Sequence, residues 1–385
     1  MLRPLSRPLV GLCRHHRASN GGGFSSAPAK KASDPLRILF CGSDAFSCES
    51  LRALHGEHVR DGRLVEALDV MVLPPKRTGR GFKQIREVPC KAVAEELGLR
   101  VHQRDTFRRW ELPEGTNLIV VVSFGLFVPP RILSSAKYGG LNVHPSLLPE
   151  PLDLRPVANY DVHHSLRGPA PIHHAMLRGD EHMGISLQTL DDRAFDHGTV
   201  LAQTPAPGLA IRRGASIQEV IREAAVQGAQ MLVQGLRDGV HVPPHVAVGG
   251  RLHGRGPTHA PKVTKADAQV DWARWTSAEA FTRRMRVFSS VWTRAAGDKG
   301  EARRVLFQDV EAVAQDDVRG AQATAVFAQE DGRYERTVVV DEAEGAVAVC
   351  IGEGAWVRVR RVRVDGRTEQ DAARAMRPFL SKMAC

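Results

Sequence analysis

The chain has 385 residues, 43% of them hydrophobic, and a formal net charge of +10. That length predicts two domains with substantial cores, and the lack of any apolar run near the roughly 18 residues of a membrane span argues against a membrane protein. The charge would suit a nucleic-acid partner, but residues 1–33 carry six basic side chains and no acid. Without them, 47 basic residues face 43 acidic ones.

Residues 1–33 are rich in arginine, contain serines and carry scattered leucines. This composition predicts a mitochondrial targeting segment, and hence a mitochondrial matrix protein, because a secretory signal needs a longer uninterrupted apolar core. A disordered basic tail is the alternative. The six cysteines form no CxxC pair and no metal-ligand spacing, so we expect free thiols in a reducing compartment.

The first predicted strand is 36–42, and the turn 42–46 follows it. A helix over about 47–55 and a strand at 67–73 complete a βαβ unit, which predicts an α/β domain with a parallel sheet. Gly42 alone is no dinucleotide fingerprint, because that needs three glycines at fixed spacing and a distal acid. The sequence therefore excludes an NAD site here.

Residues 74–83 hold four cations, two prolines, two glycines and no acid, which predicts an exposed basic loop. Such a loop is either solvated without a function or contacts phosphate groups through Arg77, Arg80 and Lys83. A helix at 88–97 and a strand at 99–103 follow it.

The apolar run 117–125 predicts a buried parallel strand, and the next strand carries Asn142 and His144 on one face. Pro145 ends that strand, and the turn 146–149 follows at its carboxyl end, where open α/β sheets bind ligands. An amide can donate to an oxyanion and an imidazole can move a proton, so the pair suits acyl transfer. A core strand whose polar residues satisfy a loop is the alternative.

Residues 150–166 show neither a helical nor a strand period and form an irregular insertion. His-His pairs at 163–164 and 173–174 do not predict a metal site, because adjacent side chains point apart and no Cys or acid completes a set. A strand at 184–190 leads to Asp196, whose carboxylate can lie over the sheet edge and tune a histidine, or can cap its own turn.

A long amphipathic helix at 216–239 begins at Ser216 and ends at Gly239. Residues 241–262 are rich in proline, glycine and histidine and are expected to be a linker. We thus expect a catalytic domain over 34–240 and a second domain over 263–385.

The second domain is predicted to hold a helix at 278–288 and five short strands, which suggests a small barrel such as an OB-fold. The strands lie near 303–310, 321–328, 336–341, 346–351 and 355–364. In the last strand the buried valines change phase at 360–361, which predicts a β-bulge. Arginines at 358, 360, 361 and 363 would line its polar side.

Five segments together resemble the signature of 10-formyltetrahydrofolate-dependent formyltransferases, and the basic loop is similar to that of methionyl-tRNA formyltransferases in particular. The segments are Asn142-Val-His144, Ser146-Leu-Leu-Pro149, Arg167-Gly-Pro-Ala-Pro-Ile172, Gly179-Asp180 and Phe195-Asp-His-Gly198. The resemblance runs from about residue 36 to 260 and continues weakly to Trp272. It implies a Rossmann-like, mostly parallel formyltransferase domain.

The resemblance also implies the roles of individual residues. Asn142, His144 and Asp196 match the family's catalytic trio, and Ser146, Leu147, Leu148 and Pro149 match its folate-contacting turn. The implied co-substrate is 10-formyltetrahydrofolate and the implied partner is initiator methionyl-tRNA, without a metal or a membrane. We expect a monomer.

Two other functions remain open: formyl transfer to a small metabolite or formyl-folate hydrolysis, and non-catalytic RNA binding. The trio argues against RNA binding alone, while the basic loop and the second domain argue against a small substrate. The chain departs from the family in one place, because 17 residues separate Leu-Leu-Pro from Arg-Gly where the family has about two. These extra residues are either a surface loop or an unspliced intron.

Overall fold

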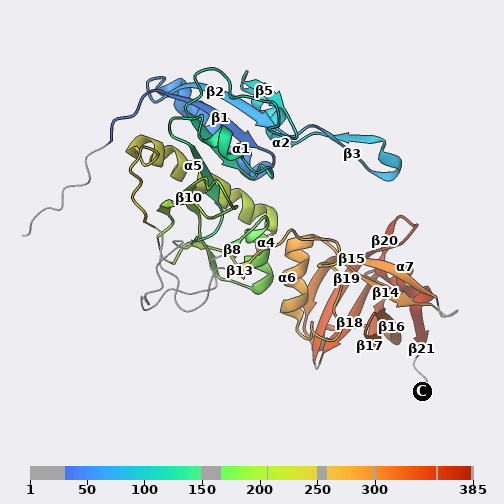
Figure 1. Ribbon diagram of the computed structural model, residues 1–385. Helices are drawn as coiled ribbons and strands as arrows, with labels where there is room; N and C mark the ends of the chain where they lie inside the picture. The colour runs from blue at the N-terminus through green and yellow to red at the C-terminus, as the bar shows by residue number, and fades with distance from the viewer. Residues whose placement is uncertain are drawn as a thin grey trace, which may run out of the picture.

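Seven strands form the first sheet of the computed structural model, which describes residues 31–148, 166–205, 207–248, 258–297, 301–352 and 354–382. The strand order is β11-β10-β7-β6-β1-β2-β5 (Figure 1). Five strands run parallel: β1 (Leu36–Gly42), β2 (Val65–Val72), β5 (Arg100–Gln103), β6 (Leu118–Val122) and β7 (Gly140–His144). The antiparallel pairings join β7 to β10 (Ser186–Thr189) and β10 to β11 (Val200–Gln203). The predicted mostly parallel α/β sheet is confirmed.

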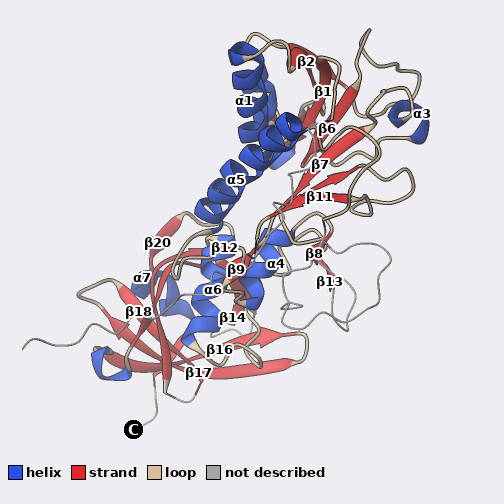
Figure 2. Ribbon diagram, turned by 90° about the vertical axis from the view of Figure 1, so that its left-hand side faces the viewer, coloured by secondary structure: helices blue, strands red, loops and turns tan. Residues whose placement is uncertain are grey.

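Both faces of this sheet are covered, which explains why the central strand β6 is apolar and buried along its whole length. In β1, Ile38 and Phe40 join the larger core, whereas Leu39 and Cys41 join a second core on the opposite face. The larger core packs beneath α1 (Ala45–Arg60), α2 (Pro89–Glu96) and α5 (Ile217–Asp238). Figure 2 shows α1 and α5 side by side on that face.

The remaining elements of this half are short. They are β3 (Lys76–Thr78), η1 (Arg80–Phe82), β4 (Gln84–Arg86), α3 (Pro130–Leu133), β8 (Leu166–Arg167), α4 (Pro171–Arg178), β9 (His182–Met183), β12 (Leu209–Ala210) and β13 (Thr258–His259). Within the described ranges, no helix is both long and apolar enough to cross a membrane.

A closed antiparallel barrel forms the C-terminal half. Its strands are β14 (Val291–Ala296), β15 (Ala302–Val313), β16 (Ala321–Gln329), β17 (Gly332–Asp341), β18 (Ala346–Gly352) and β19 (Ala355–Val364). The sequence did not predict β14, which pairs with both β15 and β16 and so closes the barrel. Smaller elements follow β15 or β19: η3 (Gln315–Asp317), β20 (Glu369–Asp371), α7 (Ala372–Met376), η4 (Arg377–Phe379) and β21 (Leu380–Lys382).

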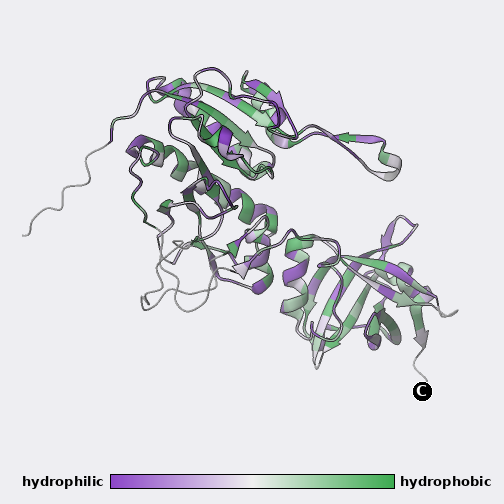
Figure 3. Ribbon diagram, in the orientation of Figure 1, coloured by the Kyte–Doolittle hydropathy of each residue, from purple (hydrophilic) through white to green (hydrophobic). Residues whose placement is uncertain are grey.

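Aromatic side chains fill the barrel. Phe307, Phe327 and Trp272 are almost completely buried, and the rings of Trp272 and Phe327 stack with their centroids 4.2 Å apart. Hydrophobic residues accordingly lie along the strands of both sheets in Figure 3.

Two predictions at the level of single residues are wrong. The bulge at 360–361 is absent, because Gln308 faces Arg361 and Val310 faces Val359 in one unbroken register. Instead, the alternation between core-facing and outward-facing residues shifts by one residue in both β15 and β19 at this point, where Asp309 has a φ of +49°. The predicted irregular insertion also ends too late: Leu166 is buried and lies in β8, which pairs with β13 inside the predicted linker. Residues 150–165 lie outside the described part of the chain.

The helix α6 (Ala278–Phe288) joins the two halves by packing on α4. Nη1 of Arg283 donates to the carbonyl oxygen of Arg178 at 3.1 Å. A Cβ at Gly179 would lie 2.6 Å from Cζ of Arg283, so the close approach needs a glycine there. This contact sets where the barrel lies relative to the carboxyl end of the sheet.

Candidate active site

A row of polar side chains faces one way across β7 and β10, because residues two apart in a strand share a face. Asn142 lies opposite Gln188, and His144 lies opposite Ser186. The Asn142 amide is held at both ends: Nδ2 donates to the carbonyl oxygen of Val121 at 3.0 Å, and Oδ1 accepts from Nε2 of Gln188 at 3.0 Å. The second N–H of Asn142 is left to bind a substrate oxygen.

His144 ends β7 with a buried imidazole ring. Its Nε2 lies 2.8 Å from the carbonyl oxygen of Leu166, and its Nδ1 lies 3.3 Å from Oδ1 of Asp196. A carbonyl oxygen and a carboxylate oxygen can only accept, so the doubly protonated ring satisfies both neighbours. The arrangement thus suits a histidine that donates a proton or a hydrogen bond.

Asp196 reaches this histidine from the loop between β10 and β11. Its φ is +58°, a left-handed conformation that Asp tolerates better than most residues. Its Oδ2 accepts the backbone N–H of Gly168 at 2.9 Å, and its Oδ1 lies 3.5 Å from Nε2 of Gln188. The carboxylate is therefore fixed from two sides before any substrate binds.

The structure thus brings the three predicted residues together at the carboxyl end of the sheet. Asn142 and His144 come from one strand, and Asp196 comes from a loop that folds back over it. Their individual roles remain predictions.

The turn after β7 is held by side chains of the neighbouring strands. Ser146 donates through Oγ to the carbonyl oxygen of Leu166 at 2.8 Å, and Ser186 donates to the carbonyl oxygen of Ser146 at 2.7 Å. The side chains of Leu147 and Leu148 are buried, and Gln203 donates to the carbonyl oxygen of Leu148 at 2.7 Å. Pro149, the fourth predicted folate contact, lies outside the described residues.

A small pocket of about 40 Å³ lies beside Asn142. Its walls are mainly apolar, and Asn142, Gln188 and Asp196 supply polar groups at one side; the apolar residues include Val121, Leu126, Phe127, Val128, Leu190 and Phe195. The rings of Phe127 and Phe195 meet edge to face with centroids 5.3 Å apart, although Phe195 is 59% exposed. Apolar walls with convergent polar groups are typical of ligand sites, but this volume is well below the roughly 300 Å³ at which such pockets begin.

Sequence reasoning missed two groups of this site. Gln188 orients both Asn142 and Asp196, and the carbonyl of Leu166 accepts from His144 and Ser146. Gln188 had a signal in the sequence, since it and Ser186 are polar residues two positions apart and so share one face of the predicted strand 184–190. The Leu166 carbonyl gave no signal in the sequence, because every residue type has a backbone carbonyl group.

The predicted basic loop is a short hairpin of β3 and β4 that projects from the sheet (Figure 1). Arg77 and Lys83 are exposed on it, and Arg80 lies in η1, although the placement of its side chain is not described. Phe82 and Ile85 are 68% and 67% exposed on the same hairpin. The hairpin thus presents cations and apolar groups together.

Three of the four arginines predicted to line the polar side of β19 are paired with acids. Arg358 and Arg360 bind Glu311 at 3.2 and 2.6 Å, and Arg361 binds Glu369 at 3.0 Å. Arg363 is exposed at the rim of a nearby groove.

That groove carries more positive charge than the strand does. Its cations are Lys262, Lys265, Arg304, Arg363 and Arg367, against one acid, Asp365. Cζ of Arg304 lies 4.3 Å from the ring centroid of Trp292, so an aromatic surface adjoins the cations. Among the residues that the structure describes, no cluster of His, Cys, Asp and Glu is placed to hold a metal ion.

The chain belongs to the formyl transferase family, because residues 36–236 match the formyl transferase family model. Three curated relatives are methionyl-tRNA formyltransferases. The chain is 32% identical over 275 residues to the enzyme of Cereibacter sphaeroides, which covers 69% of this chain and 79% of that protein. It is 31% identical over 266 residues to the mitochondrial enzyme of Bos taurus, with coverages of 69% and 60%. The mitochondrial enzyme of Saccharomyces cerevisiae is 30% identical over 296 residues, with coverages of 66% and 69%.

Proposed function

We propose that the protein transfers the formyl group of 10-formyltetrahydrofolate to the α-amino group of methionine on initiator methionyl-tRNA. The observation that carries this proposal is the joining of Asn142, His144 and Asp196 at one sheet edge in a member of the formyl transferase family. The names of the relatives, of which the chain covers up to 79%, support the choice of acceptor.

The formyl-folate supplies the carbonyl carbon that the amine attacks. Asn142 would donate its free N–H to the oxygen that becomes negative, as in an oxyanion hole. A protonated His144 would stabilise that charge, and it would donate there once its Nε2–H leaves the carbonyl oxygen of Leu166. Asp196 would hold the imidazole in its charged form and help to move the amine's proton toward the leaving nitrogen. Neither a metal nor a covalent enzyme intermediate is required.

The pocket beside Asn142 would have to widen to admit the folate. Its apolar walls suit a flat heteroaromatic ring, and the polar groups beside Asn142 would then meet the formyl group. The turn of Ser146, Leu147, Leu148 and Pro149 would hold the rest of the co-substrate. Buried leucines and the bond from Gln203 support this role because they make the turn rigid.

Two basic surfaces would hold the tRNA. Arg77, Arg80 and Lys83 lie on the projecting hairpin, and the groove of the C-terminal barrel carries Lys262 and the cations beside it. Because Arg358, Arg360 and Arg361 of β19 are paired with acids, we assign the second contact to this groove instead. Cations of this kind position a nucleic acid through its phosphates.

Formyl transfer to a small metabolite remains the alternative. The test is to incubate purified protein with formyl-folate and initiator methionyl-tRNA, elongator methionyl-tRNA or free methionine, and to analyse the amino acid. We expect formylmethionine mainly from the initiator tRNA, at a rate about two to four orders of magnitude lower with His144→Ala. Product from free methionine at a comparable rate would favour the alternative, and no product with any acceptor would contradict the proposal.

The tRNA contact has its own test. Arg80→Ala should weaken use of tRNA and reduce the slope of log affinity against log salt by about one unit if Arg80 meets a phosphate. Arg63→Ala is a matched control, because Arg63 is 93% exposed and lies outside both surfaces. Equal behaviour of the two variants in slope and in initiator selectivity would rule out a role for the hairpin.

Location and assembly belong to the same proposal. Relatives with mitochondrial names and the acid-free, arginine-rich residues 1–33 support import into the mitochondrial matrix. The proposed enzyme acts as a monomer, which light scattering at working concentration tests directly.

A further inference from the structure

Arg167 lies next to the candidate active site but outside the trio. The residue that follows it, Gly168, donates its backbone N–H to Oδ2 of Asp196 at 2.9 Å. His144 contacts the other carboxylate oxygen, Oδ1, at 3.3 Å. Arg167 therefore belongs to the Oδ2 side of Asp196, away from the contact between the two predicted catalytic groups.

The backbone at Arg167 is fixed by strand pairing. Arg167 lies opposite His259 in the β8–β13 ladder, and its carbonyl oxygen accepts the N–H of Ala260 at 2.7 Å. Gly168 has a φ of +119°, and a Cβ there would lie 2.7 Å from the carbonyl oxygen of Ala260. The guanidinium thus extends from a rigid point rather than from a loose loop.

Among the described residues, no acid pairs with the charge of Arg167. Its Nη1 lies 3.3 Å from Nε2 of the exposed His197, and its Nε is buried without an acceptor. Burial lowers the pKa of this guanidinium from its usual value. In the described part of the chain, no carboxylate forms an ion pair with it, although the negative charge of Asp196 is near enough to act on its pKa in the upward direction. A half-buried cation without a carboxylate partner lowers the stability of the fold unless a ligand supplies an anion.

We propose that Arg167, together with His197, is a subsite for a phosphate group of the acceptor, namely the phosphodiester on the 5′ side of the terminal adenosine of the aminoacyl-tRNA. This inference rests on the proposed function and names the part of the acceptor that the active site itself holds. The planar guanidinium presents paired N–H groups that match phosphate oxygens. Its rigid origin would place that phosphate at a fixed position from Asp196.

The position of Arg167 favours the acceptor over the folate as the source of the anion. Arg167 does not line the apolar pocket, which opens beside Asn142 and Gln188 on the Oδ1 side of Asp196. The carboxylates of a folate lie at the far end of the molecule from its ring. An amine must approach the formyl carbon from outside that pocket, and the phosphate of an aminoacyl-adenosine then follows it closely.

The test compares two small acceptors, methionyl-adenosine with and without a 5′-phosphate, in wild type, Arg167→Gln and Arg167→Lys. We expect Arg167→Gln to lower kcat/KM for the phosphorylated acceptor and for methionyl-tRNA by roughly 10- to 100-fold, the loss expected for a hydrogen bond between charged groups. The acceptor without phosphate and the KM for formyl-folate should not change. Arg167→Lys should recover part of the loss, because it restores charge without the fork.

Arg193→Gln is the matched control. Arg193 lies on the loop of Asp196, is 89% exposed and is only 3.7 Å from Asp192, so its replacement should change none of these constants. An equal loss for both small acceptors would overturn the proposal and make Arg167 a positioning residue for Asp196. A rise in the KM for formyl-folate alone would overturn it in favour of a folate carboxylate.

A binding measurement separates this proposal from the proposed function. Calorimetry of wild type and Arg167→Gln with adenosine 5′-monophosphate and adenosine needs neither catalysis nor folate. We expect the monophosphate to bind more tightly than adenosine only when Arg167 is present, and thermal melting confirms that the variant is folded. Equal binding of the two ligands to wild type would overturn the subsite even if methionyl-tRNA is formylated. If wild type binds adenosine 5′-monophosphate more tightly than adenosine but does not formylate methionyl-tRNA, the proposed function is contradicted and the phosphate subsite is not.

Discussion

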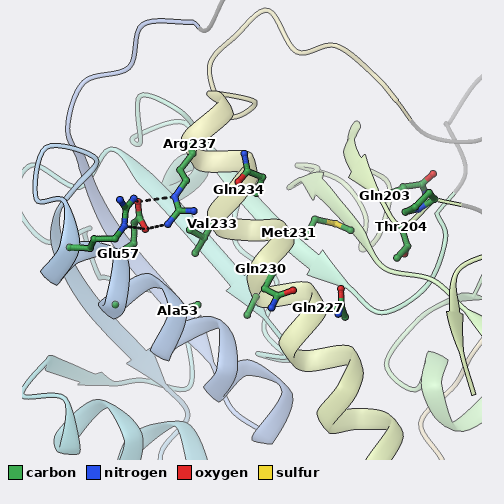
Figure 4. A pocket seen from close by; sticks show the side chains of 14 residues that line it. Ala53, Glu57, Gln203, Thr204, Gln227, Gln230, Met231, Val233, Gln234 and Arg237 are labelled. Carbon is green, nitrogen blue, oxygen red and sulfur yellow. Dashed lines mark hydrogen bonds and ion pairs between the residues drawn. The ribbon is translucent and has the colours of Figure 1, made fainter. Parts of the chain in front are cut away.

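Glu57 is the most informative single residue for the stability of the catalytic half. It lies on α1 with only 2% of its side chain exposed, and it binds Arg237 of α5 and Arg60 of its own helix (Figure 4). Arg237 donates from Nε at 3.1 Å and from Nη2 at 2.6 Å, and Nε of Arg60 donates at 3.1 Å. These guanidinium contacts lower the pKa of Glu57 from 4.5 to about 2.

The perturbation is Glu57→Gln, which keeps the shape and removes the charge. A pKa lower by about 2.5 units corresponds to at most about 3.4 kcal/mol. Arg60 and Arg237 are 57% and 42% exposed, however, so solvent screens the interaction. We therefore expect a loss of about 1.5 kcal/mol in the free energy of unfolding at pH 7.

The pH dependence follows from the lowered pKa. The contribution of Glu57 is complete above the unfolded value of 4.5 and is lost as the pH falls toward about 2. The difference between wild type and variant should therefore shrink to less than half at pH 3. Urea titration of the two proteins at pH 7 and pH 3, followed by circular dichroism, measures this.

The control is Glu66→Gln. Glu66 binds Arg37 at 3.1 Å, but 49% and 41% of the two side chains are exposed, so its loss should cost under about 0.5 kcal/mol. If Glu57→Gln and Glu66→Gln destabilise equally, or if the loss at Glu57 is the same at both pH values, the ion pair does not join α1 to α5 as argued.

Three further predictions concern other sites. His144→Ala should lower turnover by about two to four orders of magnitude without changing the melting temperature greatly, and near-normal turnover would exclude its role. Gly198→Ala should destabilise the loop of Asp196 and reduce activity, because its Cβ would lie 1.7 Å from the carbonyl oxygen of Thr189; an active variant of normal melting temperature would refute this. His241 is completely buried, and burial lowers its pKa from 6.5 to about 4, with the charge of His245 adding to the effect. Wild type should thus lose up to about 3 kcal/mol as the pH falls through that window, whereas His241→Phe should lack this part of the loss in a melting series.

Local patterns in the sequence located most elements of the fold. The strand 36–42 and the helix 278–288 lie where they were predicted. The helix α5 begins after Ser216, which accepts the N–H of Glu219, and it ends before Gly239, whose φ is +73°. Periodicity and capping depend on residues within a few positions of one another, so one chain without relatives reveals them.

The convergence of the site was also predictable in outline. Asn142 and His144 share a face because they are two residues apart in a strand, and the carboxyl ends of parallel strands form one edge. Gln188 and its bonds to Asn142 and Asp196 were not predicted, because they depend on the antiparallel register of β10 on β7.

The sequence by itself located the helices α1, α2, α5 and α6, most strands of the two large sheets, the parallel arrangement and the edge at which Asn142, His144 and Asp196 lie. Only the tertiary structure decided which polar groups meet across long stretches of chain. In the tertiary structure β14 closes the barrel, Glu311 forms ion pairs with Arg358 and Arg360 of β19, and the carbonyl oxygen of Leu166 lies within hydrogen-bond distance of His144. Within the described residues, the tertiary structure also left Nε of Arg167 buried without a hydrogen-bond acceptor. The physical reason is that hydrophobic period and turn chemistry are local, whereas the pairing of charges and backbone groups depends on register and packing between distant segments.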